Sequence, residues 1–146
     1  MHRRAVLSLF GVLILGGCQA NSNTESLEQE SQSDSIDIAQ VVSITNDPAF
    51  EPEIVEIEIG ETVRWKNETS MLPTVTAYED EIPEDGAYFA SGGYSSEPFA
   101  TMIYPFGGAL DHGEFFDHTF HTAGKYPYYS ISPEHPRITG TVIVEN

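Results

Sequence analysis

The residues of this chain that could do chemistry are five histidines, a single cysteine and a large surplus of carboxylates. The 146-residue sequence contains 23 Asp and Glu against 6 Lys and Arg, which gives a formal net charge of -17. This balance excludes a general nucleic-acid binder, which needs a basic surface, and disfavours adhesion to anionic lipids by charge. With Cys18 as its only cysteine, the chain cannot form an internal disulfide or hold an iron–sulfur cluster.

The sequence lacks the common catalytic motifs. It contains no Gly-x-Ser-x-Gly, no glycine-rich phosphate loop and no His-Glu-x-x-His. Carboxylates are plentiful, but nothing in their spacing marks one Asp/Glu pair as an acid and a base. We therefore do not expect an enzyme.

The histidines do not form a clear metal-binding pattern. His118 and His121 are three residues apart on a predicted strand, so they should point to opposite faces and make poor joint ligands. For His118 we expect a buried, hydrogen-bonded ring. His112, in a predicted turn, and His135, in the last loop, are the fallback metal ligands. Copper(II) held weakly by His135 is the best of these alternatives.

A short segment concentrates negative charge. It contains five carboxylates: Glu79, Asp80, Glu81, Glu84 and Asp85. Clustered oxygens suit calcium, but the spacing lacks the glycine and the terminal glutamate of an EF-hand loop. We expect a solvated acidic loop. The overall negative charge could attract a basic protein partner over a long range, or serve solubility in a saline setting.

The N-terminus resembles the export signal of a lipoprotein. A short basic stretch precedes an apolar run at residues 5–15, which is too short to span a bilayer as a mature helix. The following Leu-Gly-Gly-Cys, ending at Cys18, resembles a lipobox. The resemblance implies cleavage before Cys18, acylation of its thiol and anchoring to a lipid bilayer, either on the outer face of the cell membrane or in the periplasm. The alternative is an ordinary signal peptide with an incidental cysteine.

Composition divides the chain into three parts. Residues 1–17 are the predicted signal peptide. Residues 18–40 are the predicted lipidated cysteine and a disordered tether, because Ser, Asn, Gln and Glu dominate there and too few apolar residues are present to form a core. Residues 41–146 are the predicted folded domain.

The sequence pattern predicts an all-β structure for the folded domain. Apolar residues alternate with polar ones from Val41 onward, as on a half-buried strand. Inward faces are expected at Val55, Ile57 and Ile59, at Val63 and Trp65, and at Tyr126 and Tyr128. We predict a helical turn near residues 83–91. The predicted strands are 41–45, 55–59, 62–66, 74–78, 116–120, 125–130 and 139–144. Short strands with glycine-rich turns indicate a sandwich or barrel.

Several motifs of this domain match those of a known protein family. Residues 50–67 read Phe-x-Pro-x-x-Val-x-Ile-x-x-Gly-x-Thr-Val-x-Trp-x-Asn, which resembles the opening of small blue copper proteins, the cupredoxins. Thr-Val-Thr-Ala-Tyr-Glu-Asp-Glu-Ile-Pro at 74–83 and Tyr-Phe-Ala-Ser-Gly-Gly at 88–93 resemble the halocyanin branch of the plastocyanin family. Residues 113–126 resemble its penultimate hairpin and residues 139–144 its last strand. The resemblance implies a cupredoxin-like Greek-key β-sandwich or barrel of about seven to eight strands.

The same resemblance locates the positions of the copper ligands. A type 1 copper centre uses two imidazoles, one thiolate and a weak axial ligand, usually Met. The first His of halocyanins corresponds to Pro73 of this chain. The last loop aligns without a gap and places Ser130 at the Cys position, Pro133 at the second His and Ile138 at the Met. A second register would retain His135 and put Ser132 in place of the Cys.

Neither register supplies a thiolate. A serine hydroxyl is not ionised near neutral pH and is a poor ligand for copper, and proline has no donor side chain. We therefore expect no cofactor, with copper present only if the family function is retained. The predicted function is that of a binding or structural module. A partner could be a basic protein or a redox protein. The alternative is copper-dependent electron transfer, as in plastocyanin and halocyanin.

Overall fold

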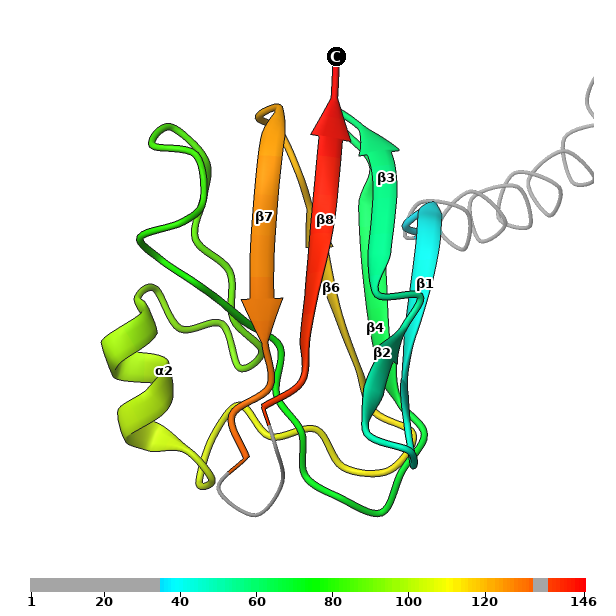
Figure 1. Cartoon of the computed structure of the whole chain (residues 1–146), viewed down its shortest axis with the longest axis vertical. Coiled ribbons are helices and arrows are strands. Elements are labelled where there is room, and N and C mark those ends of the chain that lie inside the picture. Colours follow the sequence, from blue (N-terminus) through cyan, green and yellow to red (C-terminus); the bar gives the residue numbers. More distant parts are fainter. Residues whose placement is uncertain (1–34, 133–136) are drawn as a thin grey trace, which may run out of the picture. The chain divides into compact units, whose positions relative to one another are not determined.

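The structure is a computed structural model that describes residues 35–132 and 137–146, and Asp37–Asn146 form one compact unit (Figure 1). Eight strands and one short helix occur in the described part of the chain. In chain order they are β1 (Ile38–Thr45), β2 (Ala49–Glu51), β3 (Ile54–Glu58), β4 (Thr62–Asn67), β5 (Thr76–Ala77), α2 (Glu97–Ile103), β6 (Phe115–Thr119), β7 (Gly124–Tyr129) and β8 (Thr139–Glu145).

The strands form two four-stranded sheets. The order is β2-β1-β4-β6 in the first sheet and β3-β8-β7-β5 in the second. Strands β1 and β4 are parallel, as are β3 and β8, and the other neighbouring strands are antiparallel. This architecture confirms the predicted all-β sandwich.

The core lies between the sheets and is rich in aromatic rings. Val63 and Trp65 are fully buried, as the alternation on β4 predicted. The Trp65 ring lies 5.7 Å from Phe89, 5.8 Å from Phe116 and 5.4 Å from Tyr128, measured between ring centroids. Trp65 therefore joins β4, β6 and β7 with the segment before α2, and these contacts hold the two sheets together.

Two local predictions were wrong. Residues 83–91 contain a turn, closed by a 2.9 Å hydrogen bond from the Gly86 amide to the Pro83 carbonyl, and no helix. The helix begins later because Ser96 caps it and accepts a hydrogen bond from the Phe99 amide. Ile59 is 43% exposed and lies after β3, because the chain turns at Gly60 with φ of 94°.

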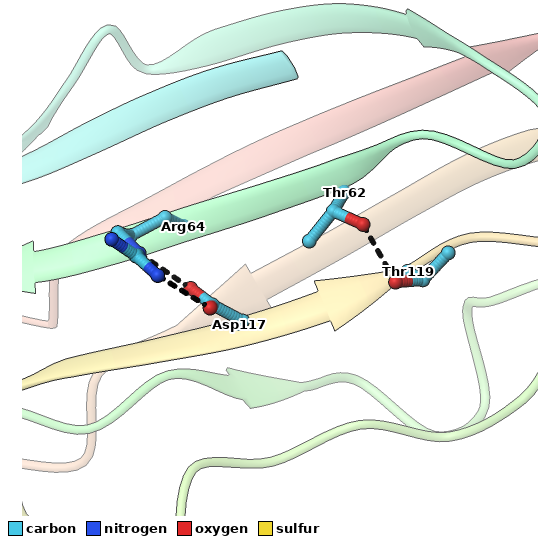
Figure 2. Close-up of polar contacts among 4 residues, drawn as sticks. All are labelled: Thr62, Arg64, Asp117 and Thr119. Carbon is cyan, nitrogen blue, oxygen red and sulfur yellow. Dashed lines mark hydrogen bonds and ion pairs between the residues drawn. The ribbon is translucent and has the colours of Figure 1, made fainter. Parts of the chain in front are cut away.

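Polar pairs on β4 and β6 support the pairing of these strands (Figure 2). The Arg64 guanidinium donates two hydrogen bonds of 2.8 Å to the Asp117 carboxylate and lies 3.8 Å from the centroid of the Phe115 ring. The Thr62 and Thr119 hydroxyls are 2.7 Å apart. Both polar pairs are direct cross-strand neighbours. They therefore support the register that turns His118 toward the aromatic core.

Candidate functional site

The structure brings together three of the four positions that the sequence assigned to family copper ligands. Pro73 precedes β5, Ser130 follows β7 and Ile138 precedes β8. All three line a cavity of about 30 Å³, whose other lining residues are Ile44, Pro48, Met71, Leu72 and Ser132. Pro133, His135 and the predicted lipidation site Cys18 lie outside the described residues. Ser130, the Cys position of the first register, and Ser132, the Cys position of the second, both line this cavity, so both registers of the last loop are compatible with the described geometry.

Hydrogen bonds occupy the serine at the predicted cysteine position. Ser130 is 2% exposed, and its hydroxyl oxygen accepts a 2.9 Å hydrogen bond from the Thr74 amide. Its own amide donates to the Ile138 carbonyl at 3.1 Å. The Ile131 amide donates to the Thr74 hydroxyl at 2.9 Å. These bonds connect the segment before β5 to the end of β7 and the start of β8.

The donor set at this cavity does not fit a type 1 copper centre. Pro73 and Ile138 have no side-chain donor, and Ser130 offers a neutral hydroxyl that already accepts a hydrogen bond. Among the described residues, no group of three or more His, Cys, Asp or Glu side chains could hold a metal ion.

The described histidines are placed in different environments. His118 lies among aromatic rings, with its centroid 4.8 Å from that of Phe89 and 4.7 Å from that of Phe120. Burial, with a smaller contribution from the nearby His121, lowers the pKa of His118 to about 4. The His118 ring is therefore neutral at pH 7. His112 has its Nδ1 atom 3.1 Å from the Thr69 carbonyl oxygen, which suits an Nδ1–H donor.

Two polar residues of this end of the sandwich were missed by the sequence analysis. Asn67 is fully buried and donates hydrogen bonds to the carbonyls of Leu110, at 2.8 Å, and Met71, at 3.1 Å. It therefore ties the segment that contains Met71 to the chain that leads into β6. The sequence signals for this role are its place at the end of a buried strand and the Trp-x-Asn motif that closes the family pattern of residues 50–67.

Glu97 is the second missed residue. Its carboxylate accepts a 2.9 Å hydrogen bond from the Glu79 amide and a 2.8 Å hydrogen bond from the Tyr129 hydroxyl. Burial and the neighbouring Glu97 raise the pKa of Tyr129, while Arg137 lies over the same ring at 4.4 Å. Through these two hydrogen bonds, Glu97 connects the start of α2 to the acidic segment and to the end of β7. Within that segment, Asp80, Glu81, Glu84 and Asp85 are exposed, as expected for a solvated loop.

Comparison with known proteins decides the family. Residues 37–145 match the copper binding proteins of the plastocyanin/azurin family. This chain belongs to that family. A plastocyanin of Scenedesmus fuscus is 30% identical to it over 96 residues, which are 66% of this chain and 86% of that protein.

Solved structures share the fold of this family member. An oxidised mutant of amicyanin superposes with a TM-score of 0.53 at 24% identity, covering 77% of this chain and 88% of amicyanin. A copper-containing nitrite reductase from Thermus scotoductus superposes with a TM-score of 0.53 at 21% identity, covering 79% of this chain. This chain spans only 24% of the nitrite reductase. Identities this low show the fold alone, so function must be argued from the residues of the site.

Proposed function

We propose that this protein is a membrane-anchored, extracytoplasmic cupredoxin-domain lipoprotein that forms no type 1 copper site and acts as a binding module. The observation that carries the proposal is the meeting of Pro73, Ser130 and Ile138 around one small cavity. Their side chains offer neither a thiolate, nor an imidazole, nor a thioether. Three of the four family positions are thus occupied by groups that copper does not bind well.

The hydrogen bonds of Ser130 add to this argument. Copper coordination by its oxygen would require the hydroxyl to lose a proton and would compete with the bond from the Thr74 amide. Met71 also lines the cavity and could supply a thioether, but a thioether is a weak copper(II) ligand without a thiolate and imidazoles. His135 can add at most one imidazole.

Anchoring and location are part of the same proposal and rest on the sequence. The Leu-Gly-Gly-Cys motif that ends at Cys18 follows an apolar run, and acyl chains on that cysteine would hold the protein to a bilayer. Among the described residues, no helix is long and apolar enough to cross a membrane. On the strength of the Leu-Gly-Gly-Cys motif, we assign the membrane attachment to Cys18 and the binding role to the folded domain.

A copper titration tests the loss of the site. Residues 19–146 would be purified, stripped with a chelator and titrated with copper(II) while the visible spectrum and the bound metal are measured. We expect no intense blue band and no stoichiometric tight binding. Weak, colourless binding that His135→Ala abolishes would identify an adventitious site. One equivalent of blue, redox-active copper would contradict the proposal and favour the alternative function, electron transfer as in the copper-binding members of the family.

A further inference from the structure

The surface around α2 displays large apolar side chains that the core does not use. Phe99 is 43% exposed, Met102 is 71% exposed and Phe106, just after α2, is 95% exposed. We name these three residues the apolar knob. Figure 1 shows α2 beside the half of β7 that ends at Tyr129, so the helix lies near the end of the sandwich that holds the ligand positions. An almost fully exposed phenylalanine next to two further apolar side chains is typical of an interaction site.

The loop that carries Phe106 is held in place by specific contacts. The Ser91 hydroxyl donates a 2.6 Å hydrogen bond to the Gly108 carbonyl and accepts one of 3.0 Å from the Val75 amide. The Tyr94 ring packs so closely against Gly107 that a Cβ atom there would overlap its hydroxyl. The Phe106 amide donates to the Ile103 carbonyl at 2.8 Å. Phe106 therefore projects from an ordered loop, which reduces the entropy lost on binding.

A groove lies next to this loop. Its volume is about 500 Å³, and Gly108, Leu110 and Phe115 line it together with the carboxylate-bearing Glu114. Backbone and apolar side chains thus form a surface that an extended segment of another protein can occupy. Gly108, which lines the groove, follows Phe106 by two residues, so the groove begins on the loop that carries this ring.

Carboxylates outnumber cations around this surface. Arg64 lies over Phe115 but is paired with Asp117, and Arg137 lies over the Tyr129 ring. Residues 67–124 contain ten Asp and Glu but no Lys or Arg. The hydrogen bond from the Glu79 amide to Glu97 places the acidic segment of residues 79–85 against the start of α2. An occupant that approaches the apolar knob therefore meets a strongly negative surrounding.

From the apolar knob, the groove and this charge, we infer that the surface binds a partner protein through a segment in which Lys and Arg flank an apolar centre. The basic groups lie against the carboxylates, and the apolar centre covers Phe106 and enters the groove. A second copy of this chain would bring like charges together, and an anionic membrane surface would be repelled. This inference rests on the proposed binding role and names the chemistry of the partner.

Three peptides of equal length test the inference on the purified domain. The first carries Lys and Arg around a Leu-Trp-Leu centre, the second replaces the centre with Ser, and the third replaces the basic residues with Glu. Binding is measured by calorimetry and mapped by amide chemical shifts, with and without copper(II). We expect only the first peptide to bind tightly, with shifts in residues 97–115 and an affinity that falls as salt rises.

Matched variants locate the site. Phe106→Ser and Met102→Ser alter exposed side chains, so the fold should persist, and each should weaken binding of the first peptide about tenfold. Ile59→Ser is the control, because Ile59 is 43% exposed and lies among Glu58 and Glu61 but away from α2. Equal loss in the control, equal binding of the Ser-centred peptide, self-association in ultracentrifugation or binding to vesicles would each overturn the inference. A blue copper spectrum with unchanged peptide binding would contradict only the proposed loss of the site.

Discussion

The aromatic core and the end of the sandwich where Pro73, Ser130 and Ile138 meet, here called the ligand end, are held by different kinds of contact. Around Trp65, four rings pack at centroid distances of 5.4 to 6.5 Å and hold the two sheets together. At the other region, Pro73, Ser130 and Ile138 meet around a small cavity, and hydrogen bonds between backbone and hydroxyl groups close the loops. Ring packing around Trp65 joins the two sheets, whereas hydrogen bonds to the Ser130 and Thr74 hydroxyls join the loops at the other region. Substitutions in the two regions should therefore affect different properties of the protein.

The largest change should follow from restoring the four ligands. The variant Pro73→His, Ser130→Cys, Pro133→His and Ile138→Met should turn intensely blue on addition of copper(II), because it supplies two imidazoles, a thiolate and a thioether at the four positions that the family resemblance assigns. Visible absorption and metal analysis measure the result. The variant without Ser130→Cys is the control and should stay colourless. A quadruple variant that folds but gives no blue band would contradict the assigned positions.

Removing the central ring should damage the fold far more than removing an exposed ring. Trp65→Ala should lower the free energy of unfolding by about 3–5 kcal/mol, because it leaves a large cavity between the sheets. Chemical denaturation monitored by far-UV circular dichroism measures this loss. Phe106→Ala, at a 95% exposed ring, is the control and should change stability by less than about 0.5 kcal/mol. A small loss for Trp65→Ala would contradict the view that packing dominates.

Ser130→Ala should have an intermediate effect. The change leaves the buried Thr74 amide without its acceptor, which should cost about 1–3 kcal/mol in unfolding free energy. The Ser130→Cys variant can still accept a weak hydrogen bond and should lose less. If the Ser130→Ala variant proved as stable as the wild type, the hydrogen bond from the Thr74 amide would not be what stabilises this end of the sandwich.

His118 should make the aromatic core sensitive to acid. Its pKa is about 4 in the folded protein, below the usual value of 6.5, so the unfolded chain binds the proton more readily. Stability should therefore fall as the pH drops from about 6.5 to 4 and level off below, by about 1–2 kcal/mol after allowance for the partial exposure of the ring. Thermal unfolding across this range measures the effect.

The variant His118→Phe isolates this contribution from the carboxylates, which also titrate near pH 4. It should remove part of the pH dependence, whereas His121→Gln, at an exposed ring, should change it little. If the stability of the wild type and of His118→Phe depended on pH in the same way, protonation of His118 would not be what destabilises the folded protein in acid.

Local patterns predicted the strands well where one face of a strand is buried. Val63 and Trp65 on β4, and Tyr126 and Tyr128 on β7, lie in the core as the alternation indicated. The pattern failed at Ile59, because an apolar residue at a strand end is exposed when the chain turns at the next position. The sequence pattern also misplaced the helix. A cap residue such as Ser96 decides where a short helix starts, and seven residues are too few for their periodicity to reveal a helix.

The amino-acid sequence by itself determined the sandwich fold, the family and the absence of a thiolate in the domain, because these follow from alternating apolar residues, short motifs and the identity of single side chains. The tertiary structure alone decided that Pro73, Ser130 and Ile138 share one cavity and that the Ser130 hydroxyl is occupied by the Thr74 amide. It also showed that Phe106 is exposed while Phe120 is buried. Such facts depend on which segments meet in space, and neither local propensity nor composition contains that information.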